Sequence, residues 1–292
     1  MNQEFRPRLN FEEYQIILKR RGITKEYEET LHPKIPKYLL IDVETLPAAA
    51  LVFTLFSKAP IQHDHLLNDV TICCWSAKWL YSTEMMSDCM TSEEAVKKDD
   101  KRIMESLWGI LNDAECIIGH NCDRFDMKMI NARFVYNKIK PPTPYQTIDT
   151  LKHTQKALGT MSHRLDYFGK FMFNKGKLHT DFSLWRKCYD GDQESLDYML
   201  KYNRVDVELL EELYLEALPY MRPHPNFALY AEATETCCIY CGHTELEDAG
   251  MYVTSANRYH AHRCKKCGGI MRDRLSDVTR QERNNMLISI AR

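Results

Sequence analysis

Apolar strand-like segments alternate with amphipathic helical segments through the middle of the chain. The sequence becomes strand-like from Lys37, and DVTICCWSAKWLYS is typical of a second strand. TSEEAVKKDDKRIMESLWGILNDA has helical periodicity and opens with a Thr-x-x-Glu capping box. CIIGH predicts a short buried strand before a helix in DRFDMKMINARFVYNK, YQTIDTLKHTQKAL repeats that order, and QESLDYMLKYNRVDVELLEELYLEAL predicts a long helix. This alternation predicts an α/β domain built around a mixed sheet with flanking helices.

The two ends of the chain differ from this middle part. The N-terminal segment is polar, with one amphipathic helix between Asn10 as N-cap and Gly22 as C-cap, which we expect to pack on the main domain rather than bind a partner. The three prolines of PYMRPHPN end the α/β domain, and a cysteine-containing module and a tail with helical character follow. We therefore predict four parts, at residues 1–36, 37–222, 232–275 and 276–292.

Composition and charge exclude several classes of protein. The 292 residues are 44% hydrophobic and 27% charged, as in a soluble globular protein. MNQEFRPRLN is unlike a secretory signal peptide, and LPAAALVFTLF has about half the length of a membrane span, so we expect no membrane partner. The net charge of −2 shows no overall excess of basic residues, although a local basic patch can still bind nucleic acid. Some of the eleven cysteines lie in apolar strands, and others form one ordered cluster near the C-terminus. This distribution favours free thiols in a reducing, cytoplasmic compartment and a metal site at the cluster.

Two acidic residues interrupt the apolar strand YLLIDVETLP. Only Val43 separates Asp42 from Glu44, so both carboxylates point to one face of the strand while Leu39 and Ile41 point to the other. Like charges on one face repel, and their burial is costly. Asp-x-Glu alone is expected about once by chance in a chain of this size, so it gains weight only in combination with other residues.

Two further aspartates lie on helices predicted beside that strand. Asp126 is near the N-terminus of the helix after GHNCDRF, where complementing the helix dipole is the simpler explanation. Tyr202 and Asp206 are four residues apart and project from one face of the long helix. Four carboxylates converge only if cations compensate them, and Mg²⁺ or Mn²⁺ prefers oxygen ligands. Two such ions can hold both the attacking and the leaving oxygen of a phosphoryl transfer.

In this order, the three motifs resemble those of the DEDD superfamily of 3′→5′ exonucleases, which share a ribonuclease-H-like fold. The matching residues are Asp42-Val-Glu44, Asn121-Cys-Asp-Arg-Phe125-Asp126 and Tyr202-Asn-Arg-Val-Asp206, and the resemblance covers roughly residues 37–220. The Tyr-x-x-x-Asp spacing looks like the tyrosine subfamily, typified by the proofreading domains of DNA polymerases. The histidine subfamily would need a histidine where Lys201 stands.

The resemblance implies a role for each matching residue. Asp42 would bridge two Mg²⁺ or Mn²⁺ ions, and Glu44 and Asp206 would complete the first metal site. Asp126 would hold the second ion, and Tyr202 would position the attacking water. Contacts to the terminal nucleotide are expected from Thr45, Leu46, Asn121 and Phe125. The following stretch, PAAALVFTLF, is more apolar than a groove lining needs, and we expect a core helix there, with a wedge against the terminal base or a partner surface as alternatives.

Two cysteine pairs near the C-terminus predict a structural metal site. Cys238-x-x-Cys241 and Cys264-x-x-Cys267 provide four thiolates for one Zn²⁺, and a glycine after each pair allows the tight turn around the metal. GMYVTSA and RYHAHR predict strands between the pairs, so the module resembles a zinc ribbon. Cys237 competes for the first position, but only Cys238 gives the two-residue spacing. Three nearby histidines are expected at the surface rather than on the metal, namely His243, His260 and His262.

The ribbon has a structural role and a candidate binding role. A module of about forty residues has too little core to fold without its metal. Tyr252 and Tyr259 are interleaved with basic residues, as in surfaces that contact phosphates and stack bases. We expect Lys265 and Lys266 to contact nucleic acid. The whole basic set is Arg258, Arg263, Lys265, Lys266, Arg272 and Arg274, with Asp273 among them.

Together these features predict a metal-dependent 3′→5′ exonuclease that acts on single-stranded ends. It would work alone or as the proofreading subunit of a separate DNA polymerase or replication protein, and the resemblance alone favours DNA over RNA. One alternative is a ribonuclease that trims RNA 3′ ends. Another is a non-catalytic adaptor that binds nucleic acid through the ribbon, although the presence of all four carboxylates and Tyr202 argues against lost activity.

Overall fold

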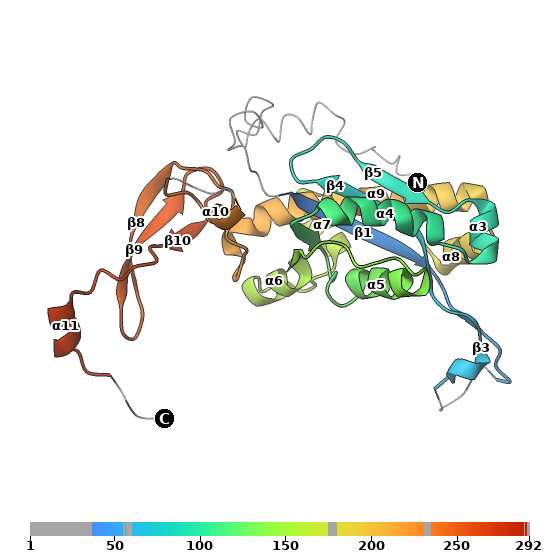
Figure 1. The fold of residues 1–292 in the computed structure, drawn as a ribbon, viewed down its shortest axis with the longest axis horizontal. Coiled ribbons are helices and arrows are strands. Elements are labelled where there is room, and N and C mark those ends of the chain that lie inside the picture. The colour runs from blue at the N-terminus through green and yellow to red at the C-terminus, as the bar shows by residue number, and fades with distance from the viewer. Residues whose placement is uncertain are drawn as a thin grey trace. The chain divides into compact units, whose positions relative to one another are not determined.

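The computed structural model describes residues 37–54, 56, 60–174, 180–230, 235–288 and 290. The helix predicted between Asn10 and Gly22 lies outside these ranges. The described residues divide into two compact units, Lys37–Tyr214 and the part from Leu215 onward. The first unit holds the predicted strand–helix alternation and the second holds the cysteine pairs (Figure 1).

A mixed five-stranded sheet forms the centre of the first unit (Figure 1). The central strand, β1, runs antiparallel to β4 and parallel to β6. β5 extends the sheet antiparallel to β4, and β7 extends it parallel to β6. The predicted α/β architecture with a mixed sheet is confirmed. In spatial order the strands are β5 (Met86–Cys89), β4 (Thr71–Trp79), β1 (Tyr38–Leu46), β6 (Cys116–Gly119) and β7 (Gln146–Asp149).

Helices flank this sheet, and most begin where the sequence predicts. The Thr91 capping box is present, but the expected single helix is two, because Lys98 takes a left-handed conformation with φ of 59°. Within the described ranges, none of the helices has both the length and the apolar character that crossing a membrane requires. The helices are α3 (Ser92–Lys97), α4 (Lys101–Asp113), α5 (Asp126–Tyr136), α6 (Thr150–Ala157), α7 (Leu165–Phe173), α8 (Phe182–Tyr189) and α9 (Gln193–Ala217).

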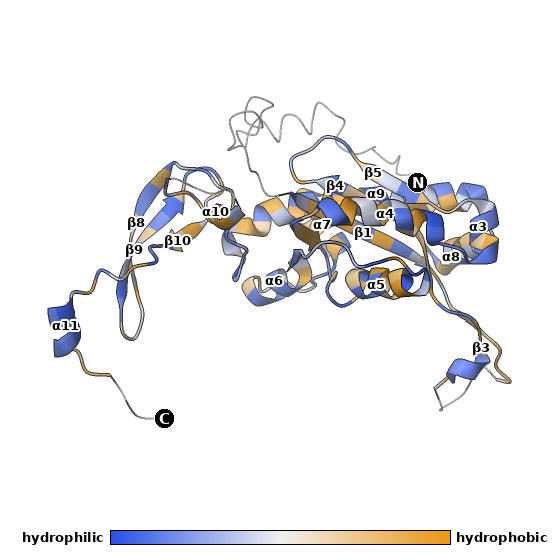
Figure 2. Ribbon diagram, viewed as in Figure 1, coloured by the Kyte–Doolittle hydropathy of each residue, from blue (hydrophilic) through white to orange (hydrophobic). Residues whose placement is uncertain are grey.

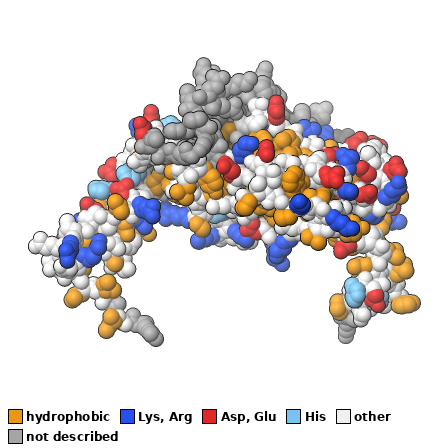
Figure 3. Space-filling view, viewed as in Figure 1, with side chains coloured by type: hydrophobic (Ala, Val, Ile, Leu, Met, Phe, Trp, Pro, Cys, Tyr) orange, Lys and Arg blue, Asp and Glu red, His pale blue; other side chains and the backbone are white. Residues whose placement is uncertain are grey.

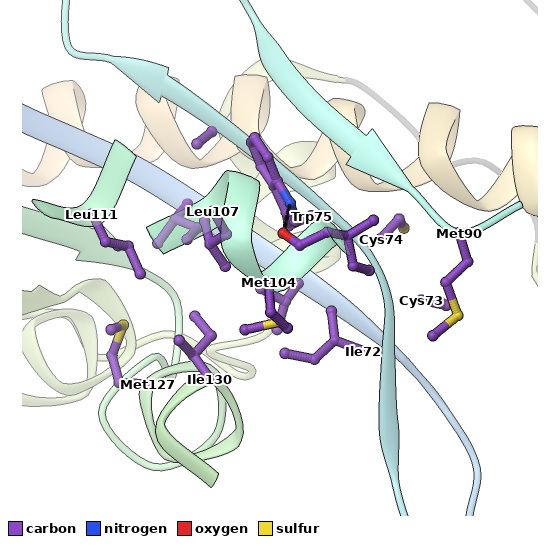
Figure 4. Close-up of a cluster of buried hydrophobic side chains, with 14 of the residues drawn as sticks. Ile72, Cys73, Cys74, Trp75, Met90, Met104, Leu107, Leu111, Met127 and Ile130 are labelled. Carbon is purple, nitrogen blue, oxygen red and sulfur yellow. Dashed lines mark hydrogen bonds between the residues drawn. The ribbon is translucent and has the colours of Figure 1, made fainter. Parts of the chain in front are cut away.

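The main hydrophobic core lies between the sheet and helices α4 and α5 (Figure 4). Ile72 and Trp75 of β4 face Met104 and Leu107 of α4 and Ile130 of α5 in this core. The Trp75 indole also donates a hydrogen bond of 2.9 Å to the Ile103 carbonyl. Because strand side chains alternate, every second residue of β1 enters this core and the residues between them lie on the opposite face. Leu39, Ile41 and Val43 are in the core, on the face of β1 opposite the two acids.

The apolar stretch after β1 is not a core helix, so that prediction was wrong. β2 (Ala49–Ala50) pairs with β3 (Leu66–Asn68) as a two-stranded arm, with the short 3₁₀ helix η1 (His63–His65) before β3. Phe53 and Phe56 are exposed at 106% and 95%, and Figures 2 and 3 show the apolar residues of the arm in orange. Apolar residues are buried only where a hydrophobic core can accommodate them. The core of the α/β unit is made by residues of other segments.

The second unit contains the sheet of the predicted ribbon. Its strand order is β10 (Ile270–Arg272), β9 (Arg258–Cys264) and β8 (Leu246–Val253), all antiparallel. β8 and β9 confirm the strands expected between the cysteine pairs. The short elements η2 (Leu218–Tyr220) and α10 (Phe227–Tyr230) precede the ribbon, and α11 (Arg280–Asn285), which has no buried residue, follows it in the predicted tail.

Candidate functional site

Three of the predicted carboxylates come together beside the central strand. One carboxylate oxygen each from Asp42, Glu44 and Asp206 lies within 4.8 Å of the other two. Strand alternation puts Asp42 and Glu44 on the same face of β1, and α9 brings Asp206 to them from far along the sequence. Asp206 is buried and the other two are half-buried. The cluster supplies the oxygen ligands that hard divalent cations prefer.

A residue that sequence reasoning missed orients one of these acids. The Asn203 side-chain amide donates a hydrogen bond of 2.7 Å to Oδ2 of Asp42. Asn203 is completely buried, and its Oδ1 has no hydrogen-bond partner within the described part of the chain. Buried side-chain oxygens normally have a partner, and this one belongs to the residue that contacts Asp42, which fits a metal site there. The available signal was spacing, because Asn203 precedes Asp206 by three residues on the same helix.

A buried ion pair fixes α9 against the sheet near this cluster. Lys78 of β4 pairs with Glu211 of α9, and both side chains are almost fully buried. The other oxygen of Glu211 accepts a hydrogen bond of 3.1 Å from the Tyr81 backbone N–H. These contacts hold the stretch of α9 that carries Asp206 in one position, so the carboxylate cluster is built into the packing of the unit.

The fourth predicted carboxylate, that of Asp126, lies beside the cluster rather than in it. Asp126 is the first residue of α5, as predicted, and its Oδ1 accepts a hydrogen bond of 3.2 Å from the Val43 N–H. β6 pairs with β1 only at residues 38–40, so Asp126 occupies the position of a strand partner farther along. Burial, with a smaller contribution from the charge of Asp149, raises the pKa of Asp126 to about 7 against the lowering effect of the Val43 hydrogen bond.

A cleft of about 1020 Å³ opens beside the carboxylates. Asp42, Asp206 and the half-buried Tyr202 line it, so the predicted tyrosine does lie next to the acids. Much of the remaining lining comes from the segments around α6 and α7. The lining residues are Asp42, His120, Asn121, Leu151, Gln155, Met161, Ser162, His163, Arg164, Leu165, Asp166, Lys170, Thr180, Tyr202 and Asp206.

The predicted nucleotide contacts differ in their access to this cleft. Asn121 lines it, whereas Thr45, Leu46 and Phe125 are not among its lining residues. Phe125 is 42% exposed, but Leu46 is 0% exposed and packs in the main core. The extra residue of the irregular pairing is Cys73 of β4, so alternation along β1 keeps Leu46 on the face of Asp42 and Glu44, where other side chains cover it completely. Leu46 therefore offers no surface to a ligand in this structure.

Asp149 holds the loop that carries Asn121 through backbone hydrogen bonds. Asp149 Oδ1 accepts hydrogen bonds from the backbone N–H groups of Asn121, at 2.9 Å, and Leu151, at 3.1 Å, and so caps α6 as well. Cys122, Asp123 and Asp149 also lie within 4.8 Å of one another. Lys152 forms an ion pair of 2.6 Å with Asp123, so a side chain of the protein already supplies positive charge to this group. We interpret the group as structural.

The four predicted cysteines converge in the second unit. Their sulfur atoms all lie within 4.8 Å of one another, with Cys238 Sγ 3.6 Å from Cys267 Sγ and Cys241 Sγ 3.7 Å from Cys264 Sγ. Tetrahedral Zn–S bonds of about 2.3 Å imply an S···S separation of about 3.8 Å, so these residues fit one zinc ion. Cys238 is in the cluster and its neighbour Cys237 is outside it.

Both knuckle glycines have the backbone that their position requires. Gly242 and Gly268 each have φ of +73°, and their N–H groups donate to the carbonyls of Cys238 and Cys264, respectively. A Cβ on Gly242 would lie 2.1 Å from the Phe227 ring. The two turns are thus equivalent in conformation, as the repeated Cys-x-x-Cys-Gly pattern predicts.

The two lysines of the second knuckle are not equivalent. Lys265 is exposed, whereas the Nζ atom of Lys266 is buried, and this burial lowers the Lys266 pKa to about 8. An aromatic and basic group lies on the ribbon sheet instead, where the Arg272 guanidinium is 3.6 Å from the Tyr259 ring centre and 5.8 Å from that of Tyr252. Of the predicted lysine pair, only Lys265 presents its charge to solvent.

The sequence model described as RNase_H superfamily matches residues 68–218. The match runs from β3 to the end of α9 and so includes Asp126, Tyr202 and Asp206. Asp42 and Glu44 precede it, but the sheet places β1 between β4 and β6, which both belong to the matched region. No curated protein matches the chain. The mixed sheet with its flanking helices fits a nuclease-type fold of this superfamily.

Proposed function

Because the chain belongs to the RNase H superfamily, we propose that it is a metal-dependent 3′→5′ exonuclease that removes nucleotides from single-stranded DNA ends. The observation that carries this proposal is the cluster of Asp42, Glu44 and Asp206 next to Tyr202 in one cleft. The superfamily supports a nuclease-type fold. The order and spacing of the three acidic motifs, which resemble those of DEDD exonucleases, favour the exonuclease reaction.

The residues that would hold the metal ions are the acids themselves. Asp42, Glu44 and Asp206 fit a first Mg²⁺ or Mn²⁺, because their oxygens already lie within 4.8 Å of one another. Asp126 is proposed for the second ion, since it contacts the backbone between the two acids of β1. Two ions bound there would stabilise charge on the phosphodiester oxygens and lower the pKa of water.

Two further residues of α9 would orient the groups that react. The hydroxyl of Tyr202 would position the attacking water, because its side chain lines the same cleft as Asp42 and Asp206. Asn203 would hold the Asp42 carboxylate in one rotamer through its 2.7 Å hydrogen bond. This arrangement is fixed before substrate binds, which reduces the cost of aligning the reacting atoms.

The ribbon is proposed to hold one structural Zn²⁺ and to contact the nucleic acid strand. Lys265 would approach a phosphate, and the Arg272 guanidinium, stacked on Tyr259, would offer its other plane to a base. The buried ammonium of Lys266 argues against a direct phosphate contact by that residue. A DNA polymerase or replication protein would be the partner in a proofreading role.

A degradation time course tests the proposed reaction. Single-stranded DNA and RNA of one sequence, each labelled at the 5′ end, are incubated with the protein with and without Mg²⁺. We expect the DNA to give a ladder that shortens one nucleotide at a time, only with Mg²⁺. Faster shortening of the RNA would make the protein a 3′-end ribonuclease, and two unchanged substrates with strong binding would favour a non-catalytic adaptor.

A further inference from the structure

The cleft beside the carboxylates has walls of different charge. Asp42 and Asp206 make one wall acidic, and Arg164 and Lys170 lie in the segment that forms another. Both basic side chains are exposed, and neither forms an ion pair with any residue in the described ranges. Asp166 also lines this segment, so the basic residues exceed the acidic ones there by one.

The position of this basic wall is fixed by the fold. Arg164 is the N-cap of α7, and Phe168, which is 0% exposed, anchors that helix. The ring Nε2 of His120 lies 2.8 Å from the His163 carbonyl oxygen and so ties the residue before Arg164 to the end of β6. Since β6 is the sheet neighbour of β1, the wall and the carboxylates share one rigid support.

The charges and the size of the cleft together fit a ligand that carries more than one phosphate. Pockets for single small ligands have volumes of about 300–1,000 Å³, and this cleft has about 1020 Å³. A phosphodiester held at the acids needs cations, whereas phosphates farther along the strand can pair directly with lysine and arginine. The acidic and the basic parts of the cleft lining therefore match a strand that carries more than one phosphate.

We propose that Arg164 and Lys170 bind the phosphates on the 5′ side of the bond that is cleaved. The inference rests on the proposed nuclease function and extends it, because it makes the preferred substrate an oligonucleotide rather than a mononucleotide ester. Both residues bind the strand and take no part in the chemical step. Their contribution is expected in KM for substrates long enough to reach them.

Two substrates of different length separate this role from catalysis. One is thymidine 5′-monophosphate p-nitrophenyl ester, which has a single phosphodiester, and the other is a ten-residue oligothymidylate. The double substitution Arg164→Gln and Lys170→Gln should raise KM for the oligonucleotide by at least about tenfold, because it removes two charged donors whose hydrogen bonds to phosphate are stronger than those of neutral groups. We expect kcat for the oligonucleotide, and both constants for the ester, to stay within about twofold. Lys156→Gln, an exposed change on α6 that does not line the cleft, is the matched control.

A binding measurement keeps the test decisive if hydrolysis is absent. Fluorescence anisotropy with a labelled oligothymidylate should show about tenfold weaker binding by the double variant than by Lys156→Gln. Its salt slope should be smaller by about 1.4, since each phosphate contact on a single strand contributes about 0.7. If the wild-type protein hydrolyses neither substrate, the proposed function is contradicted, but the phosphate-binding role of Arg164 and Lys170 is not. Unchanged KM and unchanged binding, or an equal loss on the ester, would overturn the phosphate-binding wall.

Discussion

The side-chain amide of Asn203 donates a 2.7 Å hydrogen bond to the Asp42 carboxylate, and this contact joins the long helix to the central strand at the candidate metal site. Asn203 is completely buried, whereas Asp42 is half-buried and faces the cleft. Partners of this kind orient a metal ligand and restrict its rotamers. The orientation of Asp42 therefore depends on a residue without charge that does not line the cleft.

Asn203→Ala should reduce kcat by about 10–100-fold and raise the Mg²⁺ concentration needed for half-maximal activity, because Asp42 loses its orienting hydrogen bond. Mg²⁺ titrations of the initial rate measure both effects, with thermal unfolding as a check on the fold. Lys201→Ala, an exposed change on the same helix, should leave the titration curve unchanged. An identical curve for a folded Asn203→Ala protein would show that Asn203 does not position the metal ligand.

Glu211→Ala should lower the free energy of unfolding of the α/β unit by about 3–5 kcal/mol, because it removes the buried carboxylate that pairs with the Lys78 ammonium. All four tryptophans lie between residues 75 and 185, so their fluorescence in urea reports on this unit alone. Lys97→Ala, which removes an exposed ion pair with Glu93, is the control and should have no measurable effect. Equal midpoints for the two variants would mean that the buried pair does not fix α9.

Purified protein should contain about one zinc per chain, and Cys264→Ser should lose it while Cys237→Ser keeps it. The reason is geometric, since Cys264 is in the four-sulfur cluster and Cys237 is not. Elemental analysis of protein prepared without chelators measures the content. Chelation should remove the hard cations before the thiolate-bound zinc, because sulfur ligands select Zn²⁺. Zinc loss from Cys237→Ser, or none in the wild type, would refute the ribbon assignment.

Lys265→Glu should weaken binding of single-stranded DNA and reduce the salt slope by at least about 0.7, the contribution of one phosphate contact. Lys140→Glu changes the net charge equally at an exposed position of the α/β unit and serves as the control. Binding isotherms at several salt concentrations give the slope. If both variants keep the wild-type slope, the ribbon has another role, such as docking a protein.

Local patterns predicted much of the fold. Alternation along β1 placed Asp42 and Glu44 on one face, and helical spacing placed Tyr202 next to Asp206. The Cys-x-x-Cys-Gly repeats predicted both tight turns and the convergence of the four cysteines. These features depend on residues within one element or one turn, where backbone geometry alone fixes the arrangement of the side chains.

The features that were not predicted depend on contacts between distant segments. The irregular pairing of β1 with β4 after Glu44 and the complete burial of Leu46 both depend on segments far apart in the sequence. Asp126 contacts the Val43 N–H because β6 stops pairing with β1 before that point. Likewise, the exposure of Phe53 follows from a core that other segments fill. No local pattern of apolar and polar positions contains this information.

The most direct test of the proposed function compares Asp42→Asn with the wild-type protein on 5′-labelled single-stranded DNA in Mg²⁺. The substitution keeps the size of the side chain and removes the charge that the metal needs. It also relieves repulsion with Glu44 and Asp206, so the protein should be as stable as the wild type or more stable. We expect the wild type to shorten the strand from its 3′ end and the variant to be slower by about three orders of magnitude or more. A folded Asp42→Asn protein that degrades the strand at the wild-type rate would contradict the metal-dependent exonuclease.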